Sequence, residues 1–205
     1  NPFITAGTLG GFVKRDGEVL ILSNWHVLAE GAKKGDPILQ PGRYDNGTLD
    51  DKIGALVDWH PIKFSSGITG KIRSLFCSVE NEVDAALATI EVPYVPEINE
   101  VGRISGITEK IDIGDKVSKS GRTTGYTEGR VLSTNATVKV DYDGKEALFV
   151  NQIMTTPLIR PGDSGSWLLK NSKLCGLCFA GSPRVGLANP IKKVFEKLRI
   201  QSVVK

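Results

Sequence analysis

The chain has 205 residues and a mass of 22.1 kDa, enough for one or two compact units that bury a core without disulfide or metal staples. Apolar residues make up 40% and charged residues 24%, which excludes a disordered, collagen-like or coiled-coil chain. The net charge of +3 is small and scattered, and no apolar run reaches the roughly 20 residues that span a bilayer. We therefore expect neither a nucleic-acid nor a membrane partner.

The predicted elements, taken in chain order, are mostly short strands joined by tight turns. Three pairs of apolar runs flank two-residue turn sequences: residues 11–14 and 18–22 around Asp16-Gly17, residues 138–142 and 147–150 around Asp143-Gly144, and residues 166–169 and 174–177 around Asn171-Ser172. Such turns require a positive φ, which Gly, Asn and Asp adopt more readily than other residues. Many short strands at hairpin spacing predict an all-β sandwich or barrel.

A change in composition separates the two halves of the chain. Residues 91–100 contain two prolines and three acidic residues, which predict an extended connector. We therefore place one β unit at residues 1–105 and a second at residues 106–205. The only predicted helix covers residues 190–199, with Asn189 as its N-cap, Pro190 as its first residue and apolar residues at helical spacing.

The cysteines do not suggest a disulfide framework. Cys77, Cys175 and Cys178 form an odd set, which favours a reducing, cytoplasmic compartment, with secretion as the alternative. Cys175 and Cys178 have the spacing of a zinc or redox motif, but their neighbours predict a strand. Zinc would need two more ligands from a chain with two histidines, so we expect no metal and no cofactor.

The two histidines limit which residues can act as a base. His26 follows an apolar run, whereas His60 stands before a proline among surface-type residues and is interpreted as structural. Ser164 lies between glycines, in a sequence that can expose its hydroxyl on a tight turn, although similar spacing also occurs in ordinary loops. A nucleophilic serine needs a base and a buried acid behind it. Asp84 opens an apolar run without a nearby cation, where a carboxylate needs a partner.

His26, Asp84 and Ser164 occur in the order found in chymotrypsin-like proteases. Residues 23–29, 84–87 and 162–165 resemble the three catalytic motifs of that family. The match narrows to the bacterial α-lytic protease and streptogrisin group through three further segments, residues 120–126, 129–131 and 135–142. The resemblance implies two six-stranded antiparallel β-barrels followed by a C-terminal helix.

The same resemblance implies a serine endopeptidase that acts on a protein or peptide through an acyl-enzyme. Its expected parts are His26 as base, Asp84 as orienting acid, Ser164 as nucleophile, an oxyanion hole at Gly162, Asp163 and Ser164, an ion pair between Arg122 and Asp163, and a first-subsite pocket at Leu158, Cys178, Phe179, Ala180 and Gly181. With Leu158 at the pocket base and Cys178 near its wall, we expect a small or medium apolar residue before the cleaved bond. Arg160 and Arg184 leave an acidic preference open.

The chain also departs from the family pattern. Trp25 and Val27 bracket the histidine where a small residue and a cysteine are common, and Ser166 replaces a glycine after the nucleophile. These departures bear on the compartment and not on the chemistry. Two alternatives stand beside an active peptidase. One is a binding or scaffold module that keeps the protease fold. The other is a latent protease domain of a larger regulated protein, with a flanking regulatory domain or pro-segment as a partner.

Overall fold

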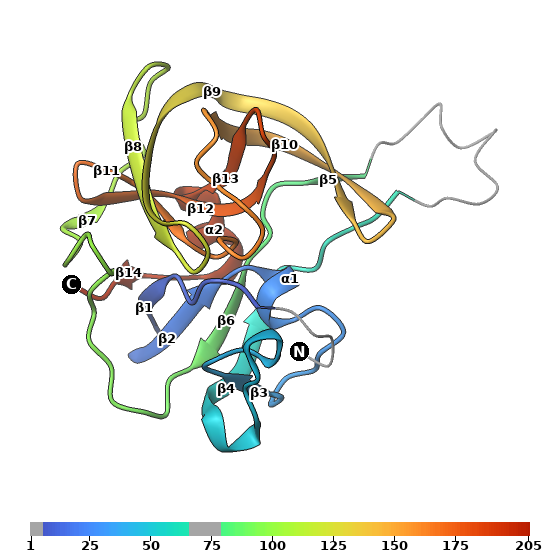
Figure 1. Cartoon of the computed structure of the whole chain (residues 1–205), viewed down its shortest axis with the longest axis vertical. Helices are drawn as coiled ribbons and strands as arrows, with labels where there is room; N and C mark the ends of the chain where they lie inside the picture. Colours follow the sequence, from blue (N-terminus) through green and yellow to red (C-terminus); the bar gives the residue numbers. More distant parts are fainter. Residues whose placement is uncertain (1–5, 66–78) are drawn as a thin grey trace.

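The computed structural model describes residues 6–65 and 79–205, and its strands form two sheets that meet along one side (Figure 1). The first sheet is antiparallel and has the order β14, β1, β2, β6, β4, β3. Its strands are β1 (Gly11–Arg15), β2 (Glu18–Ser23), β3 (Pro37–Leu39), β4 (Lys52–Trp59), β6 (Ala86–Thr89) and β14 (Ser202–Val203). Within the described ranges, no pairing joins β3 to β14, so hydrogen bonds leave this sheet open.

The second sheet closes on itself. Its six antiparallel strands are β8 (Lys116–Gly121), β9 (Gly125–Tyr142), β10 (Lys145–Thr155), β11 (Trp167–Lys170), β12 (Lys173–Gly181) and β13 (Gly186–Pro190). The ring closes because β11 pairs with both β8 and β12. Two short strands, β5 (Glu80–Asn81) and β7 (Gly106–Ile107), add in parallel to β10 and β12. The predicted all-β fold with two barrel-like units is confirmed.

The three predicted hairpins are present. Each turn has two residues with positive φ: 54° and 84° at Asp16-Gly17, 50° and 84° at Asp143-Gly144, and 50° and 58° at Asn171-Ser172. Positive φ at both central residues is the type I′ geometry, whose twist matches that of the flanking strands. These local signals were sufficient because each turn joins strands that are neighbours in sequence.

The C-terminal helix is α2 (Ile191–Leu198), and it buries the apolar side chains that predicted it. Its N-terminus differs from the prediction, because Pro190 is the N-cap residue and makes no side-chain cap. The Asn189 side chain instead accepts a hydrogen bond from the N–H of Asp84 and donates one to Gln152. The Asn189 side chain, which the sequence assigned to the helix cap, is therefore used by the buried polar groups around Asp84.

The rest of the regular structure is short. It consists of the one-turn helix α1 (Trp25–Leu28) and two 3₁₀ turns, η1 (Arg43–Asp45) and η2 (Leu49–Asp51). None of the helices in the described ranges has the length and apolar character needed to cross a membrane.

The two halves of the chain exchange strands. The C-terminal β14 pairs with β1 in the first sheet, and β5, from the first half, pairs with β10 in the second. A single buried cluster contains side chains of both sheets and of α2, including Leu22, Leu87, Leu177 and Val194. The boundary between the two units, placed at residues 105 and 106 from the composition of the connector, stays a prediction. This shared core holds the facing edges of the two sheets together.

Candidate active site

Asp84 lies just before β6 and is completely buried. Its backbone is held from both sides: the N–H donates to Asn189 Oδ1 (2.9 Å), and the carbonyl accepts from Asn24 Nδ2 (2.7 Å). Its carboxylate accepts the backbone N–H of His26 at 3.2 Å and is 2.5 Å from His26 Nδ1. The buried acid therefore has the partners that its position in an apolar run requires.

His26 lies on α1, and its ring is 21% exposed. Because Nδ1 donates to Asp84, Nε2 is the ring nitrogen left to act as a base. Burial alone would lower the pKa of His26. The negative charges of Asp84 and Glu30, together with the hydrogen bond to Asp84, outweigh that effect and raise the pKa above its usual value.

Sequence reasoning missed two side chains that contact Asp84. Asn189 was assigned to a helix cap, and Tyr142 was only part of a matching segment. The Tyr142 hydroxyl donates to Asp84 Oδ2 at 2.8 Å, and the tyrosine is 8% exposed. The available signal for Tyr142 was its place at the end of a predicted strand, directly before the Asp143-Gly144 turn. That signal carried no information about which residue the hydroxyl would reach.

Ser164 lies on the loop between β10 and β11, where glycines permit a tight backbone. Gly162 and Gly165 have φ of 96° and 95°, a region that other residues rarely adopt. A Cβ at Gly165 would lie 2.2 Å from the Thr8 carbonyl oxygen, so any side chain there would collide with backbone. The Ser164 hydroxyl donates to the carbonyl of Phe179 at 3.3 Å. No hydrogen bond joins it to His26 among the described residues.

The backbone donors of this loop divide into two kinds. In the part of the chain that the structure describes, the N–H groups of Gly162 and Ser164 have no hydrogen-bond partner. The N–H of Asp163 instead donates to the Arg160 carbonyl at 2.9 Å. The inclusion of Asp163 as an oxyanion donor was therefore wrong, because its N–H is already used inside the loop. Among the described residues, the N–H groups of Gly162 and Ser164 are therefore unpaired, and their role as oxyanion donors stays a prediction.

The ion pair predicted between Arg122 and Asp163 is absent from the structure, and this expectation was wrong. Asp163 is paired with Lys119, whose Nζ lies 3.3 Å from its carboxylate, and both side chains are completely buried. Lys119 also donates to the Thr124 hydroxyl and, at 3.0 Å, to the carbonyl of Gly125. Lys119 is buried on the same face of β8 as Val117, two residues before it. Arg122 lies just beyond the end of that strand.

Arg122 extends over the surface instead. Its guanidinium forms a bidentate pair with Asp45, and the two side chains are 31% and 34% exposed. Arg122 Cζ also lies over the Tyr44 ring, 5.4 Å from its centroid. Its backbone N–H donates to the hydroxyl of Thr8 at 2.9 Å. Arg122 therefore joins the second sheet to the η1 turn beside the first sheet. The counter-charge to Asp163 comes from Lys119.

The segment before β1 binds the Ser164 loop directly. The N–H of Thr8 donates to the Ser164 carbonyl at 2.7 Å, and its hydroxyl donates to the Gly162 carbonyl at 3.0 Å. The Thr8 carbonyl accepts the hydroxyl of Ser23 at 2.7 Å. Thr8 thus connects the loop that carries Ser164 to the end of β2, two residues before α1 begins.

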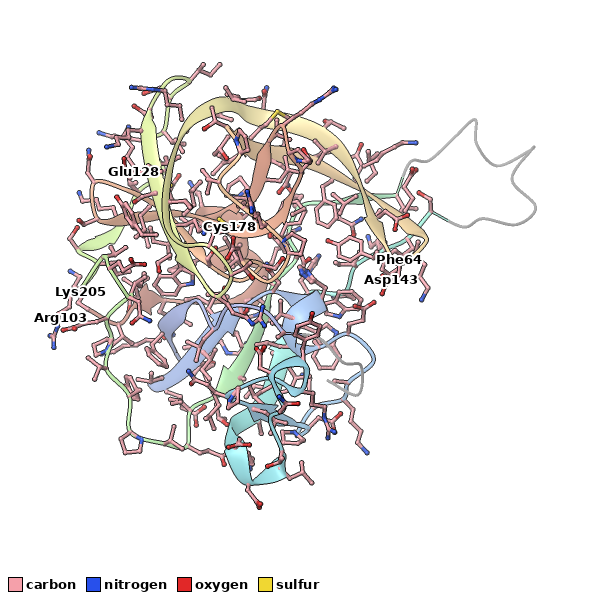
Figure 2. All side chains as sticks on the ribbon, in the orientation of Figure 1. Phe64, Arg103, Glu128, Asp143, Cys178 and Lys205 are labelled. Atoms are coloured by element: carbon pink, nitrogen blue, oxygen red, sulfur yellow. The ribbon has the colours of Figure 1, made fainter. Side chains whose placement is uncertain are left out.

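The residues expected to form a first-subsite pocket lie on and beside β12. Leu158 and Cys178 belong to one buried cluster inside the second barrel, where Cys178 is fully enclosed (Figure 2). Phe179 is buried against Phe149 at 4.8 Å between ring centroids. Gly181 is exposed, and Ala180 is partly so. The role of these residues in binding substrate stays a prediction.

In the described part of the chain, the cysteines and His60 do not come together in a second site. Cys175 and Cys178 lie on the predicted strand, and burial raises the pKa of each thiol to about 12. Cys77 lies outside the described residues. Within the described ranges, no three His, Cys, Asp or Glu side chains are grouped to hold a metal ion. His60 follows β4, where burial and two nearby lysines lower its pKa.

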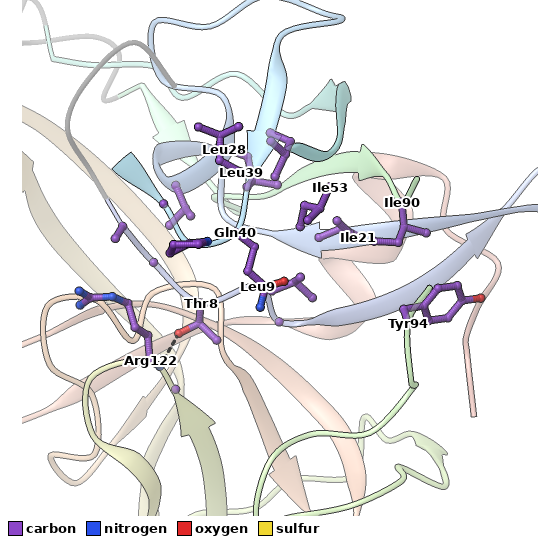
Figure 3. Close-up of a pocket in the computed structure, with 18 of the residues that line it drawn as sticks. Thr8, Leu9, Ile21, Leu28, Leu39, Gln40, Ile53, Ile90, Tyr94 and Arg122 are labelled. Atoms are coloured by element: carbon purple, nitrogen blue, oxygen red, sulfur yellow. Dashed lines mark hydrogen bonds between the residues drawn. The ribbon is translucent and has the colours of Figure 1, made fainter. Parts of the chain in front are cut away.

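A cavity of about 920 Å³ lies on the open side of the first sheet (Figure 3). Apolar side chains of β2, β3 and β4 line it, and Thr8 and Arg122 stand at the end that faces the second sheet. Its lining does not include His26, Asp84 or Ser164. This cavity therefore extends from the first sheet to Arg122 of the second, and its wall does not contain the three candidate catalytic side chains.

Three curated proteins match parts of the sequence, and no family model matches it. Streptogrisin-A of Streptomyces griseus is 39% identical over 70 residues, covering 34% of this chain and 23% of that protein. Serine protease 2 of Streptomyces fradiae is 41% identical over 70 residues, covering 34% and 38%. Streptogrisin-D of Streptomyces griseus is 32% identical over 131 residues, covering 62% and 32%. The matches span between 23% and 38% of the relatives' length.

Solved structures match almost the whole chain. Protease A of Thermobifida fusca and a Nocardiopsis protease each superpose with a TM-score of 0.65, at 17% and 16% identity, and each match covers 98% of this chain and 99% of the other. A glutamic acid-specific serine protease superposes with a TM-score of 0.62 at 17% identity, covering 97% and 98%. At these identities the likeness shows the fold, in agreement with the resemblance predicted from the motifs.

Proposed function

We propose that this chain, a chymotrypsin-like protein of the bacterial serine protease type, is a serine endopeptidase. The observation that carries the proposal is the hydrogen-bonded pair of His26 and the buried Asp84, together with a loop that carries Ser164 and two unpaired backbone donors among the described residues. The three motifs occur in the family's order, and the relatives matched in sequence include a named serine protease. Protein or peptide chains are the proposed substrates.

In the proposed reaction, the hydroxyl oxygen of Ser164 attacks the peptide carbonyl while His26 Nε2 takes the hydroxyl proton. The carboxylate of Asp84 stabilises the imidazolium that forms and keeps Nδ1 protonated. The N–H groups of Gly162 and Ser164, which have no partner among the described residues, donate to the oxyanion, and one such donor is worth about 3 to 4 kcal/mol. His26 then gives its proton to the leaving amine, and water hydrolyses the acyl-enzyme in the reverse sequence.

For the residue before the cleaved bond, we propose a small or medium apolar side chain. Leu158 brings no charge to the base of the expected pocket, and it lies in an apolar cluster with Cys178. A charged substrate side chain would lose hydration there without gaining a counter-charge from either residue. Cleavage mainly after Arg, Lys or Glu would contradict this part of the proposal.

The test is cleavage of a peptide library by the parent chain and by its Ser164→Ala variant, read by mass spectrometry. Cuts made by the parent and by the exposed-site control Ser105→Ala, but not by Ser164→Ala, are the expected result. A fluorophosphonate probe should label the parent at Ser164. Labelling without cleavage would favour the latent domain, and neither labelling nor cleavage would favour the binding or scaffold module.

A further inference from the structure

Asp84 Oδ2 accepts hydrogen bonds from two sides. One donor is His26 Nδ1 at 2.5 Å, and the other is the hydroxyl of Tyr142 at 2.8 Å. The two donors come from different units of the fold, since His26 follows the first sheet's β2 and Tyr142 is the last residue of β9 in the second. The second sheet thus contributes a hydroxyl to a carboxylate that the first sheet presents.

Aromatic packing fixes the Tyr142 ring in place. The ring makes a T-shaped contact with the His26 ring, with ring centroids 5.7 Å apart and planes at 68°. Trp25, Phe64 and Phe149 surround the remaining faces at 6.4, 5.8 and 6.3 Å. The tyrosine is 8% exposed, so water has little access to its hydroxyl. In this packing the phenol hydroxyl points to Asp84.

We propose that Tyr142 is a positioning residue for the His26–Asp84 pair. Its hydrogen bond fixes the rotation of the carboxylate, so that Oδ2 stays directed at His26 Nδ1, and it draws part of the negative charge away from the imidazole. The proposal rests on the serine endopeptidase function proposed above. Tyr142 acts through Asp84 in this role, because its hydroxyl is committed to the carboxylate.

Among the described residues, two carboxylates act directly on this assembly. Asp84 is the carboxylate in direct contact, and Glu30, after α1, adds a second negative charge at longer range. Asp143 and Lys145, in the turn that follows Tyr142, act on Glu30 with opposite signs. In Figure 2, Asp143 lies beside Phe64 at the outer end of the β9–β10 hairpin. Replacing the Tyr142 hydroxyl leaves all of these groups in place.

The first experiment measures the pKa of His26 by proton NMR in the Ser164→Ala background, with and without Tyr142→Phe. The chain has two histidines, so His60 serves as an internal reference. Without the phenol, the full charge of Asp84 acts on the imidazolium, and the pKa of His26 should rise by roughly half a unit. His60 should not move. An unchanged pKa of His26 would overturn the proposal.

The second experiment measures peptide hydrolysis by Tyr142→Phe in the active background. We expect kcat to fall about tenfold, the equivalent of one hydrogen bond to a charged group, with KM unchanged and with the acid limb of the pH profile moved upward. Tyr44→Phe, at a tyrosine that is 64% exposed, is the matched control and should leave kcat and the limb unchanged. A kcat within twofold of the parent would contradict the positioning role.

Two further arrangements keep the test decisive. If Tyr142→Phe does not fold, 3-fluorotyrosine incorporated into the full chain supplies a stronger phenol donor, and the pKa of His26 should then fall. The other three tyrosines, Tyr44, Tyr94 and Tyr126, make no hydrogen bond to His26 or Asp84 in the described part of the chain. If the parent cleaves no peptide, the endopeptidase proposal fails, while the NMR shift still decides whether Tyr142 positions the pair.

Discussion

At the scale of single residues, the charge of Asp163 decides whether the loop before Ser164 is held in place. Burial alone would raise the pKa of its carboxyl. The hydroxyl of Thr124, the N–H groups of Arg160 and Thr124, and the charge of Lys119 together lower that pKa. Asp163 therefore stays ionised while buried. Its carboxylate accepts the N–H of Arg160 and, in the turn after β8, those of Thr123 and Thr124.

Lys119→Met should remove the cation from this buried pair and leave the carboxylate of Asp163 without a counter-charge. Breaking a buried ion pair in this way costs about 3 to 5 kcal/mol, so we expect a loss of that size in the free energy of unfolding. Urea denaturation followed by circular dichroism measures it. The peptidase activity of any folded fraction should also fall, because the loop that carries the oxyanion donors loses its anchor.

Two variants serve as controls for this prediction. Lys116 lies on the same strand as Lys119 and makes an exposed pair with Glu128 of β9, so Lys116→Met should leave stability unchanged. Arg122→Leu should have a small effect, since the partner it loses is the surface residue Asp45. An Arg122→Leu variant as destabilised as Lys119→Met would mean that Arg122, as the sequence first suggested, neutralises Asp163.

At the scale of elements, the segment of residues 6–10 couples the first sheet to the Ser164 loop. Thr8 is its central contact, with its backbone bound to Ser164 and to Ser23 and its hydroxyl to Gly162. Gly7 fits because a Cβ there would lie 2.6 Å from the side chain of Val27. The position of the nucleophile loop therefore depends on a segment that is distant in sequence.

Thr8→Val should test this coupling, because it removes the hydroxyl and keeps the shape. The lost bonds are those to the Gly162 carbonyl and from the Arg122 N–H. We expect a loss of about 1 to 2 kcal/mol in the free energy of unfolding and a several-fold decrease in kcat. Thr48→Val, which removes the exposed cap of η2, should lower stability without changing kcat. Equal kcat in the Thr8 variant and the parent would show that the segment only stabilises the fold.

The elements also show which parts of the molecule a single sequence predicts. The hairpins were predictable because the turns at Asp16-Gly17 and Asn171-Ser172 carry their own backbone preference. The pairing of β14 with β1 and of β5 with β10 was not, because it joins segments far apart that have no distinctive pattern. His26, Asp84 and Ser164 were found through motifs. Lys119 and Tyr142 were missed, since only packing decides which buried partner a lysine or a phenol meets.

At the scale of the whole molecule, acid should affect activity and folding at different pH values. The pKa of His26 is raised in the folded chain, so the neutral imidazole that acts as base is lost on acidification from above about pH 6.5. The same shift makes protonated His26 stabilising below its unfolded pKa, and that contribution disappears as pH rises through the folded value. Asp163 behaves in the opposite way. Its lowered pKa stabilises the fold above about pH 3.9, and this contribution is lost as pH falls through the folded value.

We therefore predict a pH interval in which the chain is folded and inactive. Between about pH 6 and pH 4, kcat/KM should fall roughly tenfold per unit, while circular dichroism and tryptophan fluorescence stay native. Returning the sample to pH 8 should restore full activity, because the chain stays folded and protonation of His26 is reversible. Activity and ellipticity that fall together would contradict this prediction, because the acid transition would then arise from unfolding around Asp163. In that case the acid limb of the pH profile would carry no information about the His26–Asp84 pair.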